Sequence, residues 1–185
     1  MRRLLTGDAI RLTAFRAEDM PAVERWFGDS GFLRHYDMIP AAPWSGRQLE
    51  TLLMNYEKSE DQYAFAIRTN DDGKAIGIAG FDEILWSNRV ATVFIGIGEP
   101  EYAGKGLGRE AMRLLLDFGF NELNFHRIQL NVISYNDIAI RLYEGLGFVR
   151  EGVCRELIAR DGKRYDLLLY GMLDSEWRQR HQAGT

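Results

Sequence analysis

"EYAGKGLGREAM", residues 101–112, places three glycines within five positions directly ahead of an amphipathic pattern. Apolar residues then recur at helical spacing from Leu107 to Phe118. A glycine run at the start of a helix leaves backbone N–H groups uncovered and lets a ligand approach the main chain closely. The stretch therefore predicts a helix from about residue 106 that follows either an anion-binding loop or a flexible turn.

Strand patterns lie on both sides of this helix, "VATVFIGIG" at 90–98 and "RIQLNVI" at 127–133. A strand, a helix and a second strand in this order predict two parallel strands joined by a right-handed crossover. Asp72-Gly73 predicts a hairpin between strands at 62–69 and 74–84, so an antiparallel meander leads into residues 90–98. Asp161-Gly162 predicts a second hairpin near the C-terminus.

Further helices are expected at 17–29, 45–58 and 136–146. The predicted fold class is α/β (α+β), a mixed and mostly antiparallel sheet with one parallel β-α-β crossover and about four flanking helices. A chain of 185 residues is most simply one domain, and residues 1–185 are assigned to it.

Composition narrows the range of partners. The 23 Lys and Arg against 27 Asp and Glu give a net charge of −4, which argues against a nucleic-acid footprint. The single cysteine, Cys154, forms no internal disulfide, and the three histidines lack metal-ligand spacing, so no metal is expected. No stretch of about 18 apolar residues occurs. We expect a cytoplasmic protein without membrane contact, either a monomer or a homodimer.

The glycine loop does not fit the common nucleotide motifs. A P-loop requires Lys followed by Ser or Thr, whereas Lys105 is followed by Gly106. The dinucleotide fingerprint fails because its third glycine falls at Gly108 and not at residue 109. Consecutive N–H groups from 104 to 109 remain, each contributing about 1.5–3 kcal/mol to a charged ligand. Together they predict a pyrophosphate site that needs no metal.

Two segments carry a family resemblance, "GKGLGREA" at 104–111 and "NVISYNDIAIRLYEGLGFVREG" at 131–152. The second contains a spaced motif made by Asn136, Ala139, Tyr143, Gly147 and Phe148. Together they resemble the GNAT superfamily of N-acetyltransferases, in particular the branch of ribosomal-protein N-terminal acetyltransferases. The resemblance is specific from about 75 to 175 and weakest over 30–65. It implies the GNAT acyl-CoA acyltransferase fold.

The resemblance also implies acetyl-CoA as the donor, with its pantetheine arm between the strands at 90–98 and 127–133. The residues that it places on the pyrophosphate are Gly104, Lys105, Gly106, Leu107, Gly108 and Arg109. Those that it places along the rest of the cofactor are Ile95, Ile97, Asn131 and Asn136. Ala103 departs from the family pattern, which has Gln or Arg there, so we expect weaker cofactor binding.

Acetyl transfer to an amine needs an acid for the departing thiolate and a base for the amine. Tyr143, two helical turns after Asn136, is either a core tyrosine or, as the resemblance implies, the catalytic acid. Relatives often carry Glu near Thr92, and threonine accepts no proton at neutral pH. Glu99 is therefore our candidate catalytic base, with Glu83 or water as alternatives.

The lack of an obvious base bears on the acceptor. At pH 7 a lysine-type amine is neutral in about one molecule in 2,500, and an α-amine in roughly one in ten. We therefore expect an N-acetyltransferase acting on protein N-terminal α-amines. Alternatives are a small-molecule amine (aminoglycoside, amino sugar or polyamine) and a non-catalytic acyl-CoA-binding module. The aromatic segment at 35–44 is either a substrate lip or core, and the use of acyl groups other than acetyl stays open.

Overall fold

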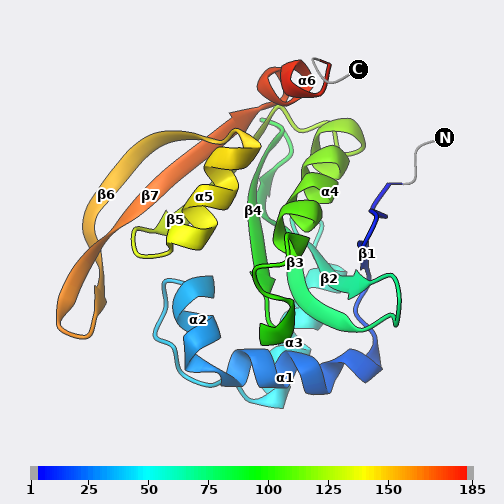
Figure 1. The fold of residues 1–185 in the computed structure, drawn as a ribbon, viewed down its shortest axis with the longest axis vertical. Helices are drawn as coiled ribbons and strands as arrows, with labels where there is room; N and C mark the ends of the chain where they lie inside the picture. The colour runs from blue at the N-terminus through cyan, green and yellow to red at the C-terminus, as the bar shows by residue number, and fades with distance from the viewer. Residues whose placement is uncertain (1–3, 183–185) are drawn as a thin grey trace.

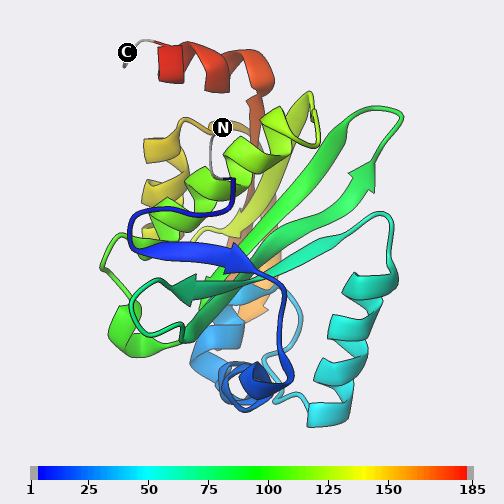
Figure 2. The same ribbon diagram turned by 90° about the vertical axis from the view of Figure 1, so that its right-hand side faces the viewer.

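The computed structural model describes residues 4–182. Seven strands form one sheet in the order β1-β2-β3-β4-β5-β7-β6, with helices on both faces (Figures 1 and 2). The strands are β1 (Ile10–Thr13), β2 (Tyr63–Thr69), β3 (Ala75–Leu85), β4 (Val90–Ile97), β5 (Arg127–Ile133), β6 (Val149–Arg160) and β7 (Lys163–Leu173). The helices are α1 (Met20–Gly28), α2 (Ser30–Tyr36), α3 (Gly46–Lys58), α4 (Leu107–Asn121), α5 (Asp137–Leu146) and α6 (Asp174–Gln182), with short 3-10 turns at Ala17–Asp19 and Pro100–Tyr102.

The strand pairings confirm the predicted fold class. β1 to β4 form an antiparallel meander, β4 and β5 are parallel, and β5, β7 and β6 are antiparallel again. α4 carries the chain from β4 to β5, so the crossover predicted around the glycine run is present. The sheet thus has two antiparallel halves that meet at one parallel pair.

The expected number of helices, about four, was too low, because the described residues form six α-helices. α2 was missed since its seven residues are too few for a periodic signal, although Asp29 caps it by accepting from Gly31 N. α6 was missed because its sequence is almost entirely polar. None of the helices within residues 4–182 is both long and apolar enough to cross a membrane.

Each face of the sheet has its own core. α4 and α5 cover one face, where Phe81, Leu115 and Ile128 are buried, and α6 lies at the end of the sheet next to β7 (Figure 2). α1, α2 and α3 cover the other face of the β1–β4 half, around Trp26 and Phe27. Successive side chains on a strand point to opposite faces. Along β4, therefore, alternate residues are turned towards the α1–α3 side.

Candidate active site

The two halves of the sheet separate along β4 and β5. These strands pair only at Val90 with Arg127, Ala91 with Ile128, and Thr92 with Gln129. Beyond Thr92, β4 pairs with β3 and β5 pairs with β7, and Figure 1 shows the β5–β7–β6 half swinging away from β4. We call the gap between residues 93–97 and 130–133 the splay. Main-chain groups that lack a neighbouring strand are free to bind an extended ligand.

Three of the residues predicted to contact the cofactor lie along the splay. Ile95 and Ile97 are half-buried on the β4 side, and Asn131 is exposed on the β5 side. A Cβ placed on Gly108 would lie 3.9 Å from both Ile97 and Leu142. The end of β4, the start of α4 and the middle of α5 therefore meet at one point beside the splay.

The glycine loop, residues 104–109, runs into α4 with an uncovered main chain. Gly104 and Gly106 have φ of 73° and 80°, in the left-handed region that favours glycine, and a Cβ on either would meet nothing within 4 Å. Gly106 is the N-cap of α4 and supplies no side-chain cap. The first N–H groups of α4, from Leu107 onward, therefore keep their hydrogen-bonding capacity for a ligand. This geometry fits the diphosphate of coenzyme A, held by amides and a helix dipole.

The two cations of the glycine loop differ in how they are engaged. Lys105 Nζ lies 5.4 Å from the centre of the Tyr102 ring. Arg109 Nη1 donates to Gly145 O at 3.3 Å, at the C-terminal end of α5. Arg109 thus ties α4 to α5, and its predicted phosphate contact stays a prediction, as does that of Lys105.

Tyr143 lies on α5 in the core shared with α4. Its side chain is 8% exposed, and its ring packs edge-on against Phe148 at 5.9 Å. Burial raises the pKa of Tyr143 to about 12, so the phenol keeps its proton at neutral pH. Among the described residues its hydroxyl has no hydrogen-bond partner. The group is therefore protonated and uncommitted, as a proton donor must be.

Asn136, predicted to bind the cofactor, has two structural contacts. Its Oδ1 accepts from Ala139 N at 3.2 Å and caps α5, and its Nδ2 donates to His35 O at 3.3 Å, at the end of α2. Its neighbour Tyr135 donates to Arg34 O, also on α2. α2 packs on β4 as well, where a Cβ on Gly96 would meet Phe32 and Tyr36. The helix therefore bridges the two sides of the splay.

Glu99, the candidate base, lies just after β4 and is only 6% exposed. Its carboxylate accepts from Arg25 at 2.6 Å and Trp26 Nε1 at 3.0 Å, and Lys74 Nζ lies 3.3 Å away. Burial, the largest single influence, acts to raise its pKa, but the bonds from Trp26, Arg25 and Lys74 together hold that pKa below its ordinary value. A carboxylate with three donors is a weak base, so these contacts favour a structural role for Glu99, and its catalytic role stays a prediction.

The sequence reading missed another carboxylate, Asp82 on β3. It pairs across the ladder with Thr92, the last residue of β4 that reaches β5. Burial raises the pKa of Asp82 to about 6, and the negative charges of Glu83 and Asp37 add to that effect, while a hydrogen bond from Tyr56 opposes it. Its Oδ1 is buried and has no partner among the described residues. Nothing local in "FDEI" distinguishes this aspartate from an ordinary strand residue.

Aromatic rings surround Asp82 on the α2–α3 side. Tyr56 Oη lies 3.5 Å from Asp82 Oδ2, and the Tyr56 ring lies 5.7 Å from Phe94 on the unpaired part of β4. Tyr36 contacts Phe94 at 6.4 Å and stacks on Phe32 at 5.1 Å. The aromatic residues between 26 and 44 thus divide between a core around Phe27 and a wall beside the splay.

Glu83, the alternative base, is exposed and accepts from Thr92 Oγ1 at 3.0 Å. Gln129 Nε2 donates to the same Thr92 oxygen at 3.4 Å. We call Asp37, Asp82 and Glu83 the acidic cluster. No Lys or Arg within residues 4–182 forms an ion pair with any of the three.

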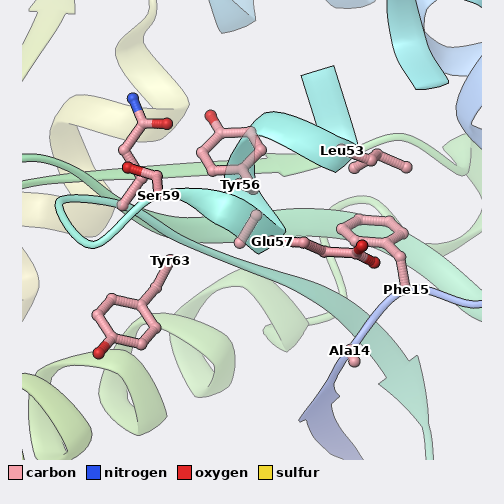
Figure 3. A pocket seen from close by; sticks show the side chains of 9 residues that line it. Ala14, Phe15, Leu53, Tyr56, Glu57, Ser59 and Tyr63 are labelled. Atoms are coloured by element: carbon pink, nitrogen blue, oxygen red, sulfur yellow. The ribbon is translucent and has the colours of Figure 1, made fainter. Parts of the chain in front are cut away.

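A pocket of about 260 Å³ lies beyond Tyr56, between α3, the start of β2 and the end of β1 (Figure 3). Glu57 and Phe15 point towards each other across it, and Tyr63 points away from them. The pocket lies next to the Asp82 region, with Tyr56 lining it. The part of the chain that the structure describes contains no group of three or more potential metal ligands.

Comparisons with known proteins agree with this geometry. Residues 9–149 match the family described as "Acetyltransferase (GNAT) domain". The chain is 29% identical over 176 residues to the SPbeta prophage-derived uncharacterized N-acetyltransferase YokL of Bacillus subtilis, covering 95% of this chain and 96% of that one. It is 30% identical over 147 residues to Spermidine N(1)-acetyltransferase of Escherichia coli (strain K12), covering 80% of this chain and 76% of that one.

One similar solved structure is spermidine N-acetyltransferase from Vibrio cholerae in complex with CoA and spermine. It has a TM-score of 0.84 and 28% identity, over 93% of this chain and 99% of that chain. The range matched by the family contains the splay, the glycine loop and α5.

Proposed function

For this chain, which belongs to the GNAT family and is an N-acetyltransferase that uses acetyl-CoA, we propose that the acceptor is a small aliphatic polyamine. The observation that carries the proposal is the acidic cluster beside the splay, whose carboxylates form no ion pair with a Lys or Arg within residues 4–182. A polyamine brings several ammonium groups separated by short apolar chains. Carboxylates next to aromatic faces suit both parts of such a molecule.

The position of the cluster supports the proposal. Asp82 faces the same side of the sheet as Thr92 and Phe94, where β4 leaves β5. An amine held there lies next to the gap in which the family resemblance places the pantetheine arm. Bringing amine and thioester together supplies on the order of 7–11 kcal/mol of the barrier, more than any single proton transfer.

Similar proteins favour the same acceptor. Two proteins named above are spermidine N-acetyltransferases, one of them solved with spermine. The expectation of a protein N-terminal α-amine rested on the lack of a base, and Asp82 removes that reason. The expected likeness to the ribosomal-protein branch stays a prediction, and the relatives support the polyamine alternative instead.

Other residues of the chain bind the cofactor, orient the thioester and donate a proton. The amides of the glycine loop bind the diphosphate, and the unpaired strand edges orient the arm that carries the acetyl thioester. Tyr143 supplies a proton to the departing sulfur. No step requires a metal.

One assay tests the acceptor. Acetyl-CoA is incubated with spermidine, spermine, putrescine, N-terminal peptides and an aminoglycoside, and free thiol and product mass are followed. We expect kcat/KM for at least one polyamine to exceed that for every peptide by about tenfold or more. Faster turnover of peptides would overturn the proposal. Tight CoA binding with background thiol release for every amine would instead indicate a non-catalytic binding module.

A further inference from the structure

Asp82 lies on β3 next to the point where the pairing of β4 with β5 ends. Its cross-strand partner Thr92 ends the β4–β5 pairing, and the next β4 residue on that face is Phe94, opposite Gly80. The Phe94 ring covers Gly80, since a Cβ there would lie 2.6 Å from the ring tip. Asp82 therefore sits at the closed end of the splay, on the face lined by α2 and α3.

The carboxylate is only partly satisfied by the protein. Oδ1 is buried without a partner among the described residues, and Oδ2 has a long contact of 3.5 Å with Tyr56 Oη. A buried acceptor without a donor costs about 1–3 kcal/mol, so the native chain retains an unfavourable group at this place. A ligand N–H that reaches Oδ1 relieves this cost.

The groups that face Asp82 carry negative charge or none. They are Tyr56 from α3, Tyr36 and Asp37 from the end of α2, and Glu83 from β3 itself. Burial raises the pKa of both Tyr36 and Tyr56 above the ordinary tyrosine value, so both stay neutral near pH 7. The surroundings thus attract a cation and keep Asp82 more basic than a solvent-exposed aspartate.

We infer that Asp82 is the catalytic base of this enzyme and binds the reacting nitrogen of the acceptor through Oδ1. The inference rests on the proposed function in assuming a cationic aliphatic amine. The carboxylate takes one proton from the bound ammonium, and the neutral amine forms a C–N bond with the acetyl carbonyl carbon as the C–S bond breaks. Tyr143 gives its proton to the departing thiolate, the second proton that leaves nitrogen restores the Tyr143 phenol, and Asp82 releases its proton to water.

The other carboxylates near the site are less suited. Glu99 is held by Arg25, Trp26 and Lys74, and its pKa is lowered. Glu83 is exposed, with one oxygen engaged by Thr92. Among the carboxylates named for this site, Asp82 alone has a buried oxygen that no donor within residues 4–182 reaches.

The test compares Asp82→Asn, Asp82→Glu and Glu83→Gln, using full-length enzyme and the best amine from the acceptor assay. At pH 7 we expect Asp82→Asn to lower kcat/KM by about 10²-fold, and Asp82→Glu to retain more activity than Asp82→Asn. Asp71→Asn, on the β2–β3 turn and exposed, is the matched control and should behave as wild type. Binding of CoA should be the same in all variants.

The pH profile separates a base from a structural role. We expect wild-type kcat/KM to fall below about pH 6, whereas in Asp82→Asn it should rise about tenfold per pH unit from 6 to 9, as the neutral amine becomes more abundant. An acid limb unchanged in Asp82→Asn, or activity within threefold of wild type, overturns the inference. So does a 10²-fold loss confined to Glu83→Gln. If Asp82→Asn does not fold, a shifted acid limb in Asp82→Glu supports the inference and an unshifted one overturns it.

These outcomes are independent of the acceptor's identity. If only peptides or aminoglycosides are acetylated, the polyamine proposal fails, and the Asp82 variants still report on the base with that amine. If polyamines are acetylated and Asp82→Asn is normal, the polyamine proposal stands and the Asp82 inference fails.

Discussion

The start of α4 and the surroundings of Asp82 flank the same gap in the sheet but present different chemical groups to it. At the start of α4 the proposed ligand-binding groups are main-chain amides, and Gly104 and Gly106 keep side chains away from them. Around Asp82 they are side chains from α2, α3 and β3, two of them negatively charged. An amide site depends on backbone angles and not on pH, whereas a carboxylate site depends on pH and on neighbouring charges. Changes to one region should therefore leave the other ligand's binding intact.

Gly106→Val should have the largest effect. A valine at φ 80° is strained by about 1–2 kcal/mol, and relief by backbone rotation misaligns at least two donors worth about 1.5–3 kcal/mol each to a charged ligand. We expect the Kd for CoA, measured by calorimetry, to rise about 100- to 1,000-fold. Gly162→Val, at φ 71° in an open hairpin turn, is the matched control and should lose stability without losing affinity. Equal affinity losses in both variants would contradict an amide-based donor site.

Tyr143→Phe should come next. Removing the hydroxyl removes the proposed acid, so kcat should fall about 10²-fold while positioning maintains residual turnover. The Kd for CoA and the melting temperature should hardly change, because the hydroxyl has no hydrogen-bond partner within residues 4–182. Steady-state kinetics at saturating substrates provide the measurement, and a kcat within twofold of wild type would remove Tyr143 from the mechanism.

Arg160→Met tests the acceptor side with a smaller effect. Arg160 Nη2 donates to Met38 O at 3.1 Å and Ile39 O at 2.8 Å, and so fixes the chain that follows α2. Without these bonds the wall around Tyr36 loosens, and we expect the amine KM to rise about three- to fivefold at unchanged CoA affinity. Arg164→Met on the same hairpin, where the arginine has one long bond of 3.5 Å to Glu156 O, serves as control. A loss of CoA affinity in Arg160→Met would show that the two regions are coupled.

The smallest effect concerns stability and pH. Burial raises the folded-state pKa of Asp82 to about 6, above its unfolded value near 4, so the folded protein binds more protons between these values. Stability from this group is therefore present at pH 4 and lost as the pH rises through 6. Allowing for solvent screening, the melting temperature of Asp82→Asn should be about 2–4 °C above that of wild type at pH 8. At pH 4 the two melting temperatures should be about the same. A lower melting temperature for Asp82→Asn than for wild type at pH 8 would mean that the fold stabilises Asp82 as an anion.

The elements around the glycine loop could be predicted from the sequence because their signals are local. Three glycines ahead of a helical stripe require no distant contact to be meaningful, and the same holds for the hairpin at Asp72-Gly73 and for the crossover. The structure confirms these elements close to the predicted positions. Tyr143 also came from a spaced motif, and its alternative interpretation as a core tyrosine agrees with its exposure of 8%.

The environment of Asp82 could not be predicted from the sequence, because it arises from tertiary contacts. Asp82 acquires its environment from Tyr36 and Tyr56, on helices that precede β3 by different lengths of chain. From the sequence, Glu99 was a candidate base, because its partners Arg25 and Trp26 lie more than seventy residues earlier and could not be foreseen. The local sequence around a charged strand residue does not predict whether the folded protein will pair that charge or leave it unpaired.

Only three residue pairs of β4 and β5 join the antiparallel halves of the sheet. Amides of residues 93–97 on the splay side have no strand to protect them from solvent exchange until a ligand lies along them. Donor binding should therefore complete the connection between the halves and raise the melting temperature in proportion to the logarithm of CoA concentration. Slowed deuterium uptake at these amides would then measure the fraction of enzyme molecules that have the donor bound.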